Sequence, residues 1–123
     1  MVDQWSQATK KLFELTESGT LKWEKMEAFT PPETFSSPER VRGGLFYSAK
    51  TNGKTLVVYE EMYPHGPDGE LPDEESRVVI EFVDDKWRTE WRWPGTDYRW
   101  QLLDAIQFQV AAGSGFLESL LAS

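Results

Sequence analysis

The only histidine of the chain, His65, is by type the residue best suited to proton transfer near neutral pH. It lies in the segment PHGPDGELPDEES, which contains three prolines and two glycines. A general base needs a fixed position and a partner that orients its ring. We expect residues 64–76 to form a mobile acidic loop, and we therefore predict that His65 is solvated and not catalytic.

The same segment is dense in acidic side chains, which raises the question of a bound cation. They are Asp68, Glu70, Asp73, Glu74 and Glu75. The common calcium loop places its oxygen ligands at alternating positions, with a central glycine and a final glutamate. The order DGELPDEE departs from that spacing, and Pro72 interrupts it. The sequence predicts a solubilising loop with no metal site.

Two pairs of adjacent carboxylates, Glu60–Glu61 and Asp84–Asp85, are the next candidates for acid–base chemistry. Neighbours on a strand point to opposite faces, so neither pair converges as hydrolysis by two acids requires. The chain also lacks a phosphate-binding glycine loop with its lysine. We predict no catalytic residue and no cofactor. An enzyme that uses Asp or Glu acids is kept as a third alternative, and it requires two carboxylates that meet in a cleft.

Basic and aromatic residues alternate in the last third of the chain. The set comprises Lys86, Arg88, Arg92 and Arg99 with Trp87, Trp91, Trp93 and Trp100. Such a mixture can bind single-stranded nucleic acid by stacking. On a strand, however, the indoles and the cations would lie on opposite faces. Because the net charge of −8 also repels phosphates, we predict no binding to nucleic acid or to an anionic membrane surface.

Length and composition restrict the class of protein. A chain of 123 residues with 39% hydrophobic residues and six tryptophans suits a single domain with a real core. The absence of cysteine excludes disulfides and thiol chemistry, and it fits a reducing cytoplasm. The N-terminal residues do not resemble a signal peptide, and no apolar run approaches the roughly 18 residues that span a membrane. We expect one cytoplasmic domain over residues 1–123.

The elements that must position these residues begin with a hairpin over residues 77–94. A turn centred on Asp84–Asp85 would pair Phe82 with Trp87 and place an aromatic stripe on one face. The other face would be mostly charged, with Glu81 opposite Arg88. This alternation is typical of a half-buried antiparallel pair.

A second hairpin is predicted over residues 44–63. Asn52–Gly53 is a strong turn signal because both residues accept positive φ. The resulting register pairs Tyr47 with Val58 and Ala49 with Leu56 on the core face. The opposite face would carry Phe46, Val57 and Tyr59. That face is too apolar to be simply solvated, so it is our candidate interaction surface.

Helices and extended segments complete the prediction. A helix over residues 3–18 is followed by a short strand over 21–26 and a Pro-rich extended segment over about 27–43. A helix that starts at Thr96 or Asp97 and ends near Val110 precedes a last short helix. The last helix carries Phe116, Leu117, Leu120 and Leu121.

The predicted fold is α+β, with a twisted antiparallel sheet of about five strands packed on one face by the N- and C-terminal helices. We expect the strands to follow one another in meander order. The predicted core contains Trp5, Leu12, Leu15, Trp23, Tyr47, Val58, Ile80, Phe82, Trp87, Trp91, Leu103 and Ile106.

These patterns favour a protein-binding or adaptor module without enzymatic activity. The apolar face that carries Phe46, Val57 and Tyr59 would be covered by the Pro-rich segment, by a second copy in a homodimer, or by another protein. The alternative is a small-ligand module. Its aromatic-lined cleft would use Trp23, Trp93 and Tyr98.

Overall fold

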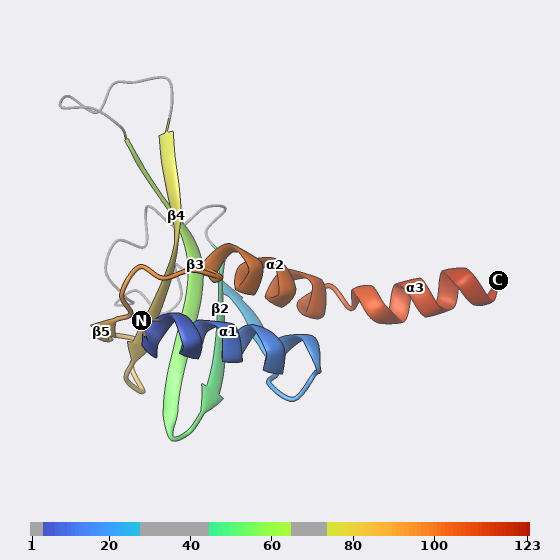
Figure 1. Ribbon diagram of the computed structural model, residues 1–123, viewed down its shortest axis with the longest axis horizontal. Coiled ribbons are helices and arrows are strands. Elements are labelled where there is room, and N and C mark those ends of the chain that lie inside the picture. Colours follow the sequence, from blue (N-terminus) through green and yellow to red (C-terminus); the bar gives the residue numbers. More distant parts are fainter. Residues whose placement is uncertain (1–3, 28–44, 65–73) are drawn as a thin grey trace.

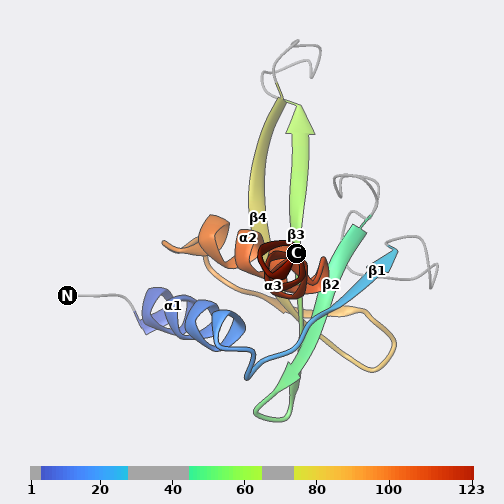
Figure 2. The same cartoon turned by 90° about the vertical axis from the view of Figure 1, so that its right-hand side faces the viewer.

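The computed structural model describes residues 4–27, 45–64 and 74–123. Its elements are α1 (Gln4–Glu17), β1 (Glu24–Glu27), β2 (Leu45–Thr51), β3 (Lys54–Pro64), β4 (Glu74–Val83), β5 (Thr89–Arg92), α2 (Arg99–Val110) and α3 (Gly113–Ala122). The five strands form one antiparallel sheet in the order β1-β2-β3-β4-β5 (Figures 1 and 2). The predicted α+β class and the meander order are confirmed.

The β2–β3 hairpin forms as its turn residues predict. Asn52 and Gly53 have φ values of 51° and 78°, which this tight turn requires. Tyr47 pairs with Val58, and Ala49 pairs with Leu56. The register prediction for this hairpin is confirmed.

The register predicted for the next hairpin, β4–β5, is wrong. Phe82 pairs with Trp91 instead of Trp87, and a bulge interrupts the pairing between Phe82 and Val83. The reason is a longer turn that Asp84 closes, because its Oδ1 accepts the backbone N–H groups of both Lys86 and Arg88 at 2.9 Å. These hydrogen bonds lower the pKa of Asp84 below its ordinary value, and the bond from the Arg88 N–H has the larger effect.

Trp87 is moved to the other side of the sheet by the same turn. It has a positive φ of 65°, and its ring meets Phe46 edge-on at 5.7 Å. Trp91 is 42% exposed and stacks on Phe82 at the rim of the helix-covered face. Trp87 and Trp91 therefore do not belong to the core in which they were predicted.

The strands β3 and β4 extend into the segment predicted to be a loop. Pro64 pairs with Glu74, so the backbone at 74–76 continues the sheet. Residues 65–73, with His65 and part of the acidic cluster, lie outside the described residues. The same holds for residues 28–44, which contain nearly all of the predicted Pro-rich segment.

The main core lies between one face of the sheet and the helices α1 and α2 (Figure 1). Its buried residues include seven of the predicted set: Leu12, Trp23, Tyr47, Val58, Ile80, Leu103 and Ile106. Trp5, Leu15 and Phe82 are partly buried and pack against this cluster. The prediction that the N- and C-terminal helices cover one face is confirmed for α1 and α2.

Helix α3 is the exception to this packing. It continues beyond α2 and projects away from the sheet and from α1 (Figure 1). None of its ten residues, all of which the structure describes, is buried. The final helix predicted from the sequence is present, but it adds nothing to the core.

Candidate interaction site at the C-terminal helices

Helix α3 carries a stripe of exposed apolar side chains, which we call the α3 stripe. Its members and their exposed fractions are Phe116 (64%), Leu117 (46%), Leu120 (56%) and Leu121 (81%). The spacing of one, three and four residues places all of them on one side of the helix. Glu118 and Ser119 fall on the other side. Large apolar side chains gathered in this way mark an interaction surface more often than an ordinary solvated face.

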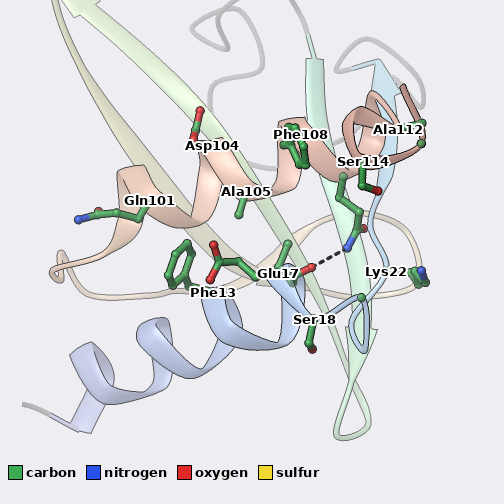
Figure 3. A pocket seen from close by; sticks show the side chains of 14 residues that line it. Phe13, Glu17, Ser18, Lys22, Gln101, Asp104, Ala105, Phe108, Ala112 and Ser114 are labelled. Carbon is green, nitrogen blue, oxygen red and sulfur yellow. Dashed lines mark hydrogen bonds between the residues drawn. The ribbon is translucent and has the colours of Figure 1, made fainter. Parts of the chain in front are cut away.

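A groove lies between α1 and α2 at the base of α3 (Figure 3). Its volume is about 790 Å³. The residues that line it come from three places: Phe13, Thr16, Glu17, Ser18, Gly19 and Lys22 around the end of α1; Gln101, Asp104, Ala105, Phe108 and Gln109 on α2; and Ala112, Ser114 and Gly115 at the start of α3. The groove and the α3 stripe are therefore neighbours on the same chain.

Gln109 holds the two helical walls of this groove together. Its amide nitrogen donates to the carbonyl oxygens of Thr16 (3.1 Å) and Leu21 (2.8 Å). Its amide oxygen accepts the backbone N–H of Trp23 at 2.8 Å. One side chain thus satisfies the Trp23 N–H and the Leu21 carbonyl, and it is a second donor to the Thr16 carbonyl, which also accepts the Gly19 N–H at 3.1 Å.

The link between α2 and α3 directs α3 away from the groove. It consists of Ala111 and Ala112, and Ala112 adopts a left-handed conformation with φ 57°. Gly113 follows directly against the ring of Phe108, where an added Cβ would lie only 2.2 Å from a ring carbon. A short link with this close contact leaves α3 little freedom to fold back onto its own chain.

The predicted interaction surface lies elsewhere and is not exposed. Phe46, Val57 and Tyr59 are all fully buried in one copy of the chain, in a second cluster with Val79 and Val83. The sequence analysis left three covers open for this face, namely the Pro-rich segment, a second copy or another protein, and these residues are already buried in a single copy. The alternation along the strands was correct, but it does not reveal how the second face is covered.

The residues predicted to form a ligand cleft do not come together as a cleft. Trp23 and Trp93 are buried in the main core, and their indole N–H groups donate to the hydroxyls of Thr16 (2.9 Å) and Thr9 (3.0 Å). Tyr98 precedes α2 and is only partly buried. These indoles serve the core and are not presented to a ligand.

A buried ionic cluster on the second face of the sheet was missed from the sequence. Glu81 is fully buried and accepts a hydrogen bond from Nε of Arg92 at 2.9 Å. Glu61 is nearly as buried and lies 2.8 Å from Arg77 and 3.4 Å from Arg92. Two carboxylates thus converge on one guanidinium, which balances much of their charge. Neither carboxylate lines the groove beside α3.

Tyr59 completes this ionic cluster. Burial raises the pKa of its phenol well above the ordinary value, and the charge of Glu81 raises it further. The sequence feature that could have predicted this cluster is the presence of Glu61 and Glu81 on neighbouring strands. Arginines lie beside both glutamates in the strand pairing. Glu81 was assigned to a charged and solvated face because strand alternation says nothing about burial.

The described ranges contain neither a metal-binding cluster nor a membrane-spanning helix. No group of three potential ligands, from His, Cys, Asp or Glu, lies close enough there to hold a metal ion. Among the helices of those ranges, none has the length and apolar character needed to cross a bilayer.

The chain matches no protein-family model, no curated protein and no solved structure. Its own geometry is therefore the basis for any functional proposal.

Proposed function

We propose that this protein is a protein-binding module that docks on its partner through the α3 stripe. The observation that carries the proposal is the exposure of all four members of the stripe on a helix that projects from the folded body (Figure 1). A short amphipathic helix that lays its apolar side into a groove is a recurrent mode of protein recognition.

The energetics support docking of this helix. Full burial of one Leu or Phe side chain contributes about 1.5–3 kcal/mol, so four partly exposed ones contribute several kcal/mol before the cost of association. A helix of ten residues is also marginal by itself in water. Contact with a partner would stabilise both the helix and its position.

The charges of the chain support an apolar contact in this region. The chain carries a net charge of −8, whereas α3 contains a single charged side chain, Glu118. At the contact with α3, the acidic surface therefore does not determine which partner binds. Complementary apolar shape would determine affinity there, and the remaining charge would mainly influence the association rate.

The test replaces Leu117 with a photo-crosslinking amino acid and identifies the crosslinked protein in the native host by mass spectrometry. The identified protein is then purified, and its affinity is measured for the unaltered chain, for Leu120→Glu and for Ser119→Glu. Both substitutions add the same charge to exposed positions of one helix. We expect Leu120→Glu to weaken binding at least about tenfold and Ser119→Glu to change it little.

The proposal is rejected if no protein, including a second copy of the chain, crosslinks at position 117. It is also rejected if the two charge substitutions weaken binding equally, because a contact made by the α3 stripe must distinguish its two sides. Circular dichroism on each variant shows whether the fold is retained.

A further inference from the structure

We infer that the partner of α3 is a second copy of this chain, and that α3 of each copy docks in the groove between α1 and α2 of the other. This inference rests on the proposed function and names its partner. It predicts a symmetric homodimer held by two equivalent helix-in-groove contacts.

The first argument is that the α3 stripe and the groove are adjacent on the same chain. Ser114 and Gly115, at the start of α3, line the end of the groove (Figure 3). When α3 of one copy enters the groove of a second, α3 of the second copy leaves from a point beside that groove and runs back toward the first. With the two α3 helices antiparallel, the two contacts form together and close around a twofold axis, instead of continuing into a filament.

The link before α3 is the second argument. Only Ala111 and Ala112 separate the two helices, and Gly113 passes against Phe108 without room for a Cβ. This arrangement lets helix α3 project away from α1 and the sheet of its own chain (Figure 1). A groove and a complementary helix that cannot meet within one chain can still meet between two.

The chemistry of the groove suits the α3 stripe. Phe13, Ala105 and Phe108 supply apolar wall, and Gly19 and Gly115 allow a helix to approach closely. Acidic groove residues, Glu17 and Asp104, would oppose an acidic docking segment. Helix α3 has its only charged side chain away from the stripe, so two copies of net charge −8 need not place like charges in the contact.

Two equivalent contacts bury twice the area of one helix-in-groove contact. Specific interfaces typically bury about 1,200–2,000 Å² in total. The second contact therefore adds to the stability of the dimer, while one intact contact still gives a weaker association.

The experiment measures molar mass by light scattering across a wide range of concentrations. We expect the unaltered chain to approach twice its 14.2 kDa mass. Leu120→Glu alters the helix, and Ala105→Glu alters the groove wall; each is expected to weaken dimerisation at least about tenfold. Ser119→Glu, on the other side of α3, should dimerise like the unaltered chain. An equimolar mixture of the two disrupted variants retains one intact contact and should form a heterodimer that neither forms alone.

A second measurement keeps the inference testable if a charged variant misfolds. The chain has no cysteine, so Leu120→Cys in one copy and Ala105→Cys in another introduce the only thiols. Oxidation of the mixture should give a disulfide-linked heterodimer, whereas Ser119→Cys with Ala105→Cys should give much less. Equal crosslinking of both mixtures overturns the proposed geometry.

The outcomes separate this inference from the proposed function. A chain that stays monomeric at every concentration, or a dimer insensitive to Ala105→Glu, overturns the inference. If position 117 then crosslinks to a different protein in a manner sensitive to Leu120→Glu, the protein-binding function stands with another partner. If it crosslinks to nothing, both proposals fail.

Discussion

The two C-terminal helices, α2 and α3, follow each other directly in the chain but differ in how much of their apolar surface is buried. Helix α2 buries Leu102, Leu103 and Ile106 against the sheet. Helix α3 carries four large apolar side chains in ten residues and buries none of them. The difference shows that apolar content does not by itself place a helix in a core. What decides burial is whether another element lies opposite the apolar side.

Specific polar anchors also distinguish the two helices. Arg99, at the start of α2, donates to the carbonyl oxygen of Val78 in β4 at 2.9 Å. Gln109, near the end of α2, joins it to α1 and to the following turn. Helix α2 is therefore held at both ends, whereas α3 projects away from the sheet and from α1 (Figure 1).

Truncation of a leucine should have the largest effect and should differ most between the two helices. Leu102→Ala leaves a cavity in the core and is expected to lower the free energy of unfolding by about 2–5 kcal/mol. Leu120→Ala at an exposed position should change it by less than about 0.5 kcal/mol. Urea denaturation at a protein concentration low enough to disfavour dimers measures both. Similar losses for the two variants would show that α3 packs on its own chain.

Loss of the Gln109 anchor should have the next largest effect. Gln109→Ala leaves the Trp23 N–H and the carbonyl oxygens of Thr16 and Leu21 without this partner. We expect a loss of about 1–3 kcal/mol in unfolding free energy. Gln107→Ala, an exposed position on the same helix, is the matched control and should be nearly neutral. Equal effects in denaturant melts would contradict the anchoring role.

Alkaline pH should lower the free energy of unfolding of the folded body, and α3 should not contribute to this loss. The raised pKa keeps the Tyr59 phenol protonated in the folded chain, while in the unfolded chain it ionises above about pH 10. This group adds no pH dependence below that value. Above it, the unfolding free energy should fall by up to about 1.4 kcal/mol per pH unit.

Denaturation at a series of pH values checks this behaviour. Tyr59→Phe should reduce the alkaline slope, whereas Leu120→Glu should leave it unchanged because α3 projects away from the sheet whose strands carry the ionic cluster (Figure 1). An unchanged slope in Tyr59→Phe would show that another group causes the alkaline loss.

Substitution of the glycines in the first turn of α3 should have the smallest effect on stability. Gly115→Ala adds a Cβ into open space and should stabilise α3 by up to about 1 kcal/mol. Gly113→Ala gains the same helix propensity but forces the Phe108 ring to move. We therefore expect Gly113→Ala to be the less stable of the two and to alter the aromatic NMR signals of Phe108. Identical behaviour of the two variants would mean that the Gly113–Phe108 contact is absent in solution.

The sequence predicted much of the fold but few of the site residues. The β2–β3 register followed from Asn52–Gly53 because local turn chemistry dictates it. The β4–β5 register failed because Asp84 closes a longer turn with a bulge, and period-two alternation cannot count the residues in a turn. Trp87 was assigned to the main core for the same reason, although its ring lies against Phe46 on the second face.

The functional predictions depended on burial, which alternation does not report. The face of Phe46, Val57 and Tyr59 was identified as apolar with three alternative covers, and the structure buries these residues within one copy. The α3 stripe was identified as a helix and assumed to pack. A stripe of apolar residues looks the same in sequence whether its partner is in the same chain or in another.

The sequence by itself determined the α+β class, the helix and strand types, the β2–β3 register and most of the main core, because each follows from local periodicity and turn chemistry. Only the tertiary structure decided that Glu81 is buried with Arg92, that Trp87 changes sides, and that α3 leaves the body beside an open groove. Those features depend on contacts between residues far apart in the chain, and such contacts form only when the elements pack together.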